Sequence, residues 1–191
     1  KQEIDEVIEA GADIIMLPYW KSNAETENFI SYVNGRCKTL LLLETKEAVD
    51  CLDQVLEIPS IDEFHIGLND LRISYGYADM FDPFGSGLLD DLSGKLRKAG
   101  IPFGIGGIGQ FGLGLSPSPE ELIAEHYRLG STAVILSRTF CNTEKLGNIR
   151  AIAEVLSENV RILREIENHA VVMSPEEFAN NHRAVRKALG Y

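Results

Sequence analysis

The stretch TLLLLET at residues 39–45 decides the fold class of this chain, because four consecutive leucines run directly into a carboxylate. A continuous apolar run of this length is typical of a parallel strand that is covered on both faces. A second stretch, EFHIGLND at residues 63–70, follows the same pattern and ends in Asp70. Both stretches therefore predict buried parallel strands, with Glu44 and Asp70 placed just beyond their carboxyl ends.

The position of these two acidic residues predicts a site. Barrels and open sheets of the α/β class carry their chemistry at the carboxyl ends of the strands. Two carboxylates that meet there without a cationic partner are typical oxygen ligands of a divalent metal. The alternative is that Glu44 and Asp70 only favour the N-termini of the helices that follow. Because the arrangement occurs twice, we expect Glu44 and Asp70 to be metal ligands.

Outward from these stretches, the chain repeats a strand-then-helix pattern. The expected strands are residues 13–17, 40–43, 64–67, 101–105 and 132–137, and the expected helices are residues 22–34, 46–56, 88–99 and 118–129, with a loop over 75–87. Such alternation predicts a parallel sheet. Five parallel strands cannot close a barrel alone, since closure links strand number to tilt and shear. The units form either an open doubly wound sheet or part of an eight-stranded (β/α)8 TIM barrel.

The two ends of the chain carry helical patterns. Residues 1–4, KQEI, start within such a pattern and without Met, so we expect a longer protein. We assign residues 1–147 to a partial, catalytic barrel and residues 148–191 to C-terminal helices. The apolar spacing of residues 149–163 exceeds what one barrel needs, and the first strand would have an unpaired edge. We therefore expect a homo-oligomer; the alternative is that these helices only cover their own barrel.

Composition narrows the class of protein. The 191 residues are 45% hydrophobic and 25% charged, which is typical of one globular domain. The net charge of −11 argues against nucleic acid as a partner. No apolar run reaches the roughly 20 residues of a membrane span. Cys37, Cys51 and Cys141 lie far apart and predict reduced thiols in a cytoplasmic protein.

A glycine-rich segment follows the fourth expected strand. The stretch GIGGIG at residues 104–109 matches a dinucleotide-binding pattern, but FGLGL at residues 111–115 continues the loop where that pattern requires a helix. We expect instead that Gly106 and Gly107 let the backbone touch a substrate closely. The alternatives are a loop without chemical importance and an anion site of a phosphate-binding barrel.

Other polar residues are weaker candidates. His65 lies within a strand, where a histidine is usually part of the core, and His126 is expected on an outer helix with a structural role. Arg138 follows the fifth strand directly, so it is either a cation near the site or part of a simple salt bridge. No GxSxG motif is present, which argues against serine hydrolase chemistry.

Several of these segments together resemble a known family. The stretches LLETKEAV at residues 42–49, ID at 61–62 and IGLNDL at 66–71 are similar to the HpcH/HpaI aldolase/citrate lyase family of metal-dependent pyruvate aldolases and acyl-CoA lyases. GA at 11–12, LP at 17–18 and SYG at 74–76 extend the similarity. The resemblance implies that the five strands are the fourth to eighth of a (β/α)8 barrel.

The resemblance also implies roles for particular residues. Glu44 and Asp70 would ligate Mg²⁺ or Mn²⁺, and the substrate would be an oxo acid or an acyl-CoA. The segment Gly67, Leu68 and Asn69 would bind substrate, with backbone N–H groups through Asp70 holding its carboxylate. The implied reaction is cleavage or formation of a bond to a pyruvate-like enolate.

The chain departs from the family pattern in three respects. Leu68 stands where the family commonly has Pro, and Leu42 where it often has Gln. The family's catalytic Arg and His belong to early strands, which would lie upstream of Lys1. These differences leave open the substrate and a second reading, in which the barrel is catalytically inactive and serves as a scaffold or ligand-binding module.

Overall fold

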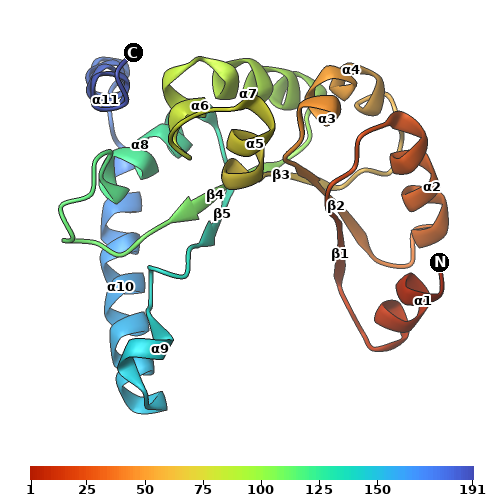
Figure 1. The fold of residues 1–191 in the computed structure, drawn as a ribbon, viewed down its shortest axis with the longest axis horizontal. Coiled ribbons are helices and arrows are strands. Elements are labelled where there is room, and N and C mark those ends of the chain that lie inside the picture. The colour runs from red at the N-terminus through yellow and green to blue at the C-terminus, as the bar shows by residue number, and fades with distance from the viewer.

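The computed structural model describes all 191 residues, Lys1–Tyr191, and contains one sheet of five parallel strands. The strands lie side by side in sequence order. They are β1 (Ile14–Leu17), β2 (Lys38–Leu43), β3 (Glu63–Ile66), β4 (Phe103–Ile108) and β5 (Ala133–Leu136). The sheet forms an arc with helices along its outer side (Figure 1). The chain is thus a parallel α/β half-barrel, which confirms the expected parallel sheet.

Alternation along β2 shows why the leucine run becomes a strand with two faces. Leu41 and Leu43 are fully buried beneath the helices, whereas Leu40 and Leu42 point to the inner side of the arc and are partly buried. Pairing places Leu42 beside His65 of β3, and His65 beside Gly104 of β4. The inner face therefore presents every second residue of each strand, as the two-residue period requires.

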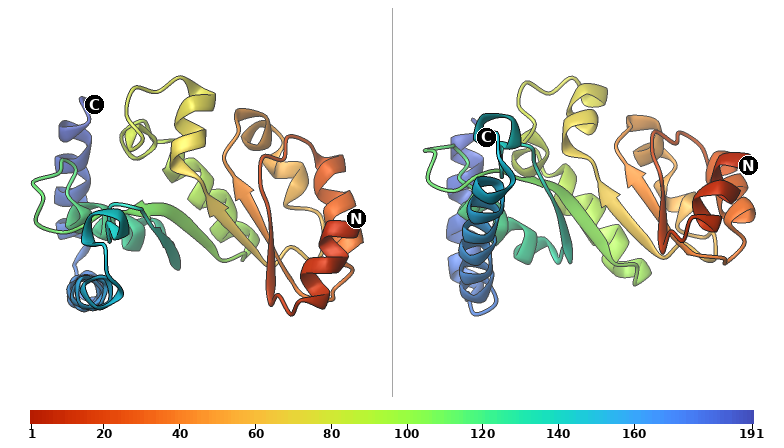
Figure 2. Two further views of the ribbon diagram at one scale, coloured as in Figure 1. Left: turned by 60° about the horizontal axis from the view of Figure 1, so that its bottom comes forward. Right: turned by 90° about the horizontal axis from the view of Figure 1, so that it is seen from below.

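Eleven helices accompany the sheet. They are α1 (Gln2–Glu9), α2 (Asn23–Val33), α3 (Lys46–Asp50), α4 (Leu52–Val55), α5 (Leu68–Tyr75), α6 (Asp82–Gly85), α7 (Leu88–Ala99), α8 (Pro119–Leu129), α9 (Thr143–Leu146), α10 (Ile149–Ala170) and α11 (Pro175–Ala188). Helices α2, α4, α7 and α8 lie on the outer side of the sheet (Figures 1 and 2) and carry buried apolar residues of the core. None of the eleven is long and apolar enough to cross a lipid bilayer.

Three sequence predictions need correction. The helix expected over residues 46–56 is two helices, because Cys51 leaves helical geometry at φ −102° and ψ 6°. The fourth strand continues to Ile108, because Gly106 and Ile108 still pair with β5, so much of the glycine-rich segment is strand rather than loop. The loop over residues 75–87 contains the short helix α6.

The C-terminal helices pack at least partly on their own chain. Helix α11 contacts α8 and α6, and α10 contacts α8. Val185 of α11 and Leu163 of α10 are buried, and the fully buried carboxylate of Glu125 accepts hydrogen bonds from Asn181 and pairs with His182 of α11. Ile149 at the start of α10 remains 85% exposed. Packing of these helices on a second copy stays a prediction.

Candidate functional site

The two carboxylates singled out in the sequence follow neighbouring strands. Glu44 comes directly after β2, and Asp70 lies in the first turn of α5, which begins immediately after β3 and Gly67. Thr45 caps α3 by accepting the Ala48 N–H, so the Glu44 side chain is not needed as the cap of that helix. Local structure therefore places both carboxylates at the carboxyl edge of the sheet.

Glu44 is almost completely buried. The residue is 3% exposed, and Oε1 accepts a hydrogen bond from the backbone N–H of Tyr19 at 2.9 Å. A Cβ atom at Gly67 would lie 2.9 Å from Glu44 Oε2, so the glycine makes room for this oxygen. Burial raises the pKa of Glu44, and the charge of Asp70 adds to the increase. Glu44 is thus a carboxylate that a bound cation would stabilise.

Tyr19 connects this carboxylate to the second one. Its phenolic O–H donates to Asp70 Oδ1 at 2.5 Å, while its backbone N–H donates to Glu44. The hydrogen bond to Asp70 and partial burial raise the pKa of the Tyr19 phenol. Sequence analysis assigned no role to Tyr19, although its place after Pro18 at the end of the first strand was the available signal.

The segment that begins α5 has free backbone donors. Gly67 is the N-cap residue and makes no side-chain cap, and the first intrahelical bond runs from Leu71 N–H to Gly67 O. The N–H groups of Leu68, Asn69 and Asp70 therefore have no helical acceptor, as in any first helical turn. Such a turn favours an anion. The predicted substrate-binding residues Gly67, Leu68 and Asn69 thus adjoin the predicted metal ligands.

The glycines of β4 make room for His65. A Cβ atom at Gly104 would lie 2.4 Å from His65 Nδ1, and one at Gly106 would lie 3.4 Å from Nε2. His65 is 3% exposed, and its Nε2 has no hydrogen-bond partner. Burial lowers the pKa of His65 to about 4, so the ring is neutral at pH 7. A Cβ atom at Gly107 would lie 3.0 Å from Ile135 O. Substrate contact at Gly106 and Gly107 stays a prediction.

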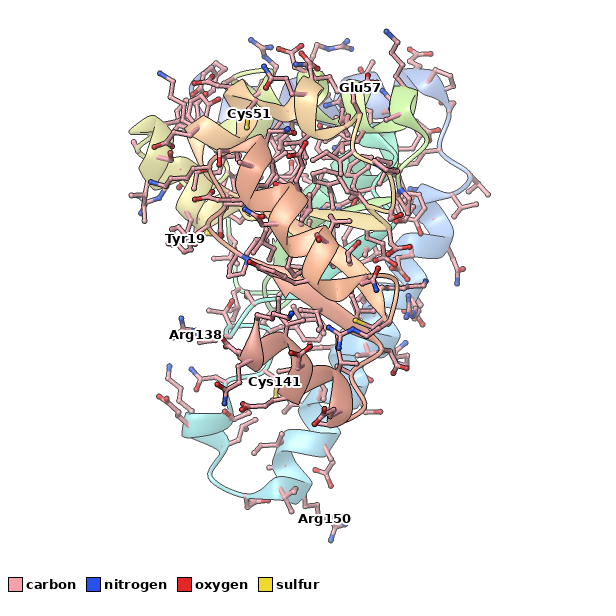
Figure 3. The ribbon with its side chains drawn as sticks, turned by 90° about the vertical axis from the view of Figure 1, so that its right-hand side faces the viewer. Tyr19, Cys51, Glu57, Arg138, Cys141 and Arg150 are labelled. Carbon is pink, nitrogen blue, oxygen red and sulfur yellow. The ribbon has the colours of Figure 1, made fainter.

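The other candidates separate into structural and free groups. His126 is buried on α8 against Ser131 and Phe84, as a structural residue would be. Arg138 is exposed and makes no ion pair, so a simple salt bridge is not its role in this structure. Tyr19 and Arg138 project from the same side of the molecule in Figure 3, since both follow carboxyl ends of parallel strands.

The residues present suit a hard divalent cation. Glu44 Oε2 and Asp70 Oδ2 accept no hydrogen bond from the protein. No three Asp, Glu, His or Cys side chains gather closely enough to hold an ion by themselves. Two carboxylates would leave the remaining positions to water or substrate oxygens, which is how Mg²⁺ is commonly bound. Metal binding by Glu44 and Asp70 stays a prediction.

Comparisons with known proteins agree with the resemblance seen in the sequence. The 2-keto-3-deoxy-L-rhamnonate aldolase of Escherichia coli K12 is 36% identical over 69 residues, which are 36% of this chain and 25% of the aldolase. The same enzyme from Escherichia coli HS matches equally. The matched segment thus spans about a quarter of these relatives. No family model matches the chain.

Solved structures show the same fold. RipC from Yersinia pestis has a TM-score of 0.59 at 14% identity, covering 92% of this chain and 72% of that protein. An HpcH/HpaI aldolase from Desulfitobacterium hafniense DCB-2 has a TM-score of 0.59 at 14% identity, and the alignment covers 80% of this chain and 68% of that protein. An HpcH/HpaI aldolase/citrate lyase family protein from Burkholderia cenocepacia J2315 has a TM-score of 0.58 at 16% identity, and the alignment covers 83% of this chain and 68% of that protein. The predicted resemblance is therefore confirmed in both sequence and fold.

Proposed function

We propose that this chain, given its confirmed resemblance to HpcH/HpaI aldolases, is part of an aldolase-type carbon–carbon lyase that acts on a pyruvate-like oxo acid. The observation that carries the proposal is the pairing of Glu44 and Asp70 at the carboxyl edge of the sheet, where Tyr19 binds both. The five strands would be the fourth to eighth of a (β/α)8 barrel. The family's catalytic Arg and His would then come from a part of the protein that precedes this sequence.

Each residue of the site would have a distinct role. Glu44 Oε2 and Asp70 Oδ2 are the oxygens left free to hold Mg²⁺ or Mn²⁺. The first-turn N–H groups of Leu68 and Asn69 would donate to the substrate carboxylate and orient it. The bound cation would supply a Lewis acid for negative charge that develops on oxygen during C–C cleavage.

Burial of Glu44 supports this assignment. A carboxylate that is 3% exposed and lacks a cationic side chain as partner is costly unless its charge is compensated. The Tyr19 N–H compensates only part of that charge. A divalent cation beside Glu44 Oε2 would supply the remainder, and Asp70 would complete its protein ligands.

The experiment is an assay of the full-length protein for pyruvate release from 4-hydroxy-2-oxo acids, with EDTA and after addition of Mg²⁺ or Mn²⁺. We expect activity that EDTA abolishes and that the cation restores. Glu44→Gln and Asp70→Asn should lose at least about 100-fold in kcat/KM. Glu47→Gln is the matched control, because Glu47 is exposed and pairs only with Lys21.

Two results would contradict the proposal. Activity that persists in EDTA and in both carboxylate variants would exclude a metal site at Glu44 and Asp70. No pyruvate release from any substrate of the panel would favour the scaffold or ligand-binding alternative, in which the half-barrel binds a ligand without turning it over.

A further inference from the structure

The backbone conformation of Tyr19 is unusual. Its φ is +52°, in the left-handed region that a bulky residue seldom adopts. Asn34 shares that region at φ +49°, but it ends α2, where left-handed residues are common. Tyr19 lies two residues beyond the end of β1 and caps no helix. Strain of this kind concentrates at functional sites, so the contacts of Tyr19 need an explanation.

Those contacts are with the two predicted metal ligands. The backbone N–H of Tyr19 donates a hydrogen bond to Oε1 of Glu44, and its phenolic O–H donates one to Oδ1 of Asp70. No other hydrogen bond reaches either carboxylate. Tyr19 as a whole is 57% exposed, so packing does little to hold the residue in place. In this conformation Tyr19 makes both hydrogen bonds.

The pattern of occupied and free oxygens has a consequence. Each carboxylate gives one oxygen to Tyr19 and keeps the other free: Oε2 of Glu44, over Gly67, and Oδ2 of Asp70. A neutral donor on each group also weakens the repulsion between two neighbouring negative charges. Hydrogen bonds of this kind to metal-ligating side chains set their orientation.

We propose that Tyr19 is a positioning residue that binds one oxygen of each carboxylate and thereby aims the other two at a shared divalent cation. This role rests on the proposed function and deepens it, because it adds a group that touches both ligands without ligating the ion. The phenol acts as a hydrogen-bond donor to Asp70, and the backbone N–H acts in the same way on Glu44.

The test is the affinity of the full-length protein for Mn²⁺, measured by titration calorimetry and by the electron paramagnetic resonance signal of free Mn²⁺. Tyr19→Phe removes the phenolic donor and keeps the backbone N–H, so we expect Mn²⁺ affinity to fall about 10- to 100-fold. Tyr32→Phe is the matched control, because the Tyr32 hydroxyl makes no hydrogen bond and the residue is 41% exposed. Thermal melts by circular dichroism will show that both variants are folded.

A second variant separates the phenol from the backbone. Tyr19→Gly keeps the N–H and suits a positive φ, so it should fold and should bind Mn²⁺ as weakly as Tyr19→Phe. If Tyr19→Phe bound Mn²⁺ within twofold of the wild-type affinity, or more tightly, the positioning role would be overturned. Loss of Mn²⁺ binding in Glu44→Gln would still show that the metal site itself is real. A wild type that binds no Mn²⁺ would overturn the metal site itself, and this role of Tyr19 with it.

Discussion

The buried ring of His65 makes protein stability depend on pH in a way that can be measured. Its pKa falls from 6.5 in the unfolded chain to about 4 in the fold, so the folded protein holds the neutral ring. A depressed pKa means that this stability is complete above pH 6.5 and is lost as the pH falls. Between pH 7 and pH 5, protonation of the unfolded state alone should lower the free energy of unfolding by about 2 kcal/mol.

The perturbation that isolates this effect is His65→Leu. Leucine has no titratable group, and it removes the Nε2 atom that is buried without a partner. We expect the variant to be at least as stable as the wild type at pH 7, since an unsatisfied buried polar atom costs about 1–3 kcal/mol. Its loss of stability from pH 7 to pH 5 should be about 2 kcal/mol smaller than that of the wild type.

Urea unfolding at the two pH values, followed by circular dichroism, measures both quantities. His169→Gln is the control for the loss of a histidine side chain, because His169 is exposed on α10. Burial lowers the pKa of His126 to about 3, with a smaller contribution from His65. Between pH 7 and pH 5 the contribution of His126 comes from protonation of the unfolded state, so it is nearly the same in both proteins. Equal losses of stability in wild type and His65→Leu would refute the reasoning.

Three further outcomes are expected. Gly67→Ala should place a Cβ atom 2.9 Å from Glu44 Oε2 and so displace that carboxylate. We expect Mn²⁺ binding to weaken by at least about 10-fold while the circular dichroism spectrum stays unchanged; an unaltered Mn²⁺ affinity would contradict this. Glu125→Ala should lower the free energy of unfolding, measured in urea, by about 3–5 kcal/mol, because it leaves Arg128 and α11 without a fully buried partner. A loss under about 1 kcal/mol would show that the contacts of Glu125 with Arg128 and α11 are not needed for stability. Light scattering should give a mass above the 21.1 kDa of one chain, because the outer edge of β1 is unpaired and the start of α10 is exposed. A stable monomer of 21.1 kDa would exclude the homo-oligomer.

Sequence patterns were sufficient for the five strands and for most of the helices, and they placed Glu44 and Asp70 just beyond two strand ends. The leucine run at residues 40–43 predicted a buried strand because apolar continuity is itself the requirement for burial on two faces. Ser118 and Ser174 each precede Pro-Glu-Glu in the sequence, and both begin a helix with a capping box that has both reciprocal hydrogen bonds. Ser22 also caps its helix, but without a capping box, because Glu25 accepts from the Lys21 N–H instead of from the Ser22 backbone. The backbone N–H groups of Lys21 and Ser22 compete for the Glu25 carboxylate, and sequence spacing does not show which of them binds it.

What the sequence determined by itself was the order of strands and helices and the placement of Glu44 and Asp70 beyond two strand ends. These depend on interactions between residues a few positions apart, which hydrophobic period and capping chemistry record directly. Only the tertiary structure decided that Tyr19 joins both carboxylates and that Gly104 makes room for the His65 ring. Those contacts bridge 25 to 51 residues of chain, and they depend on strand register and on one left-handed backbone angle, neither of which a local pattern records.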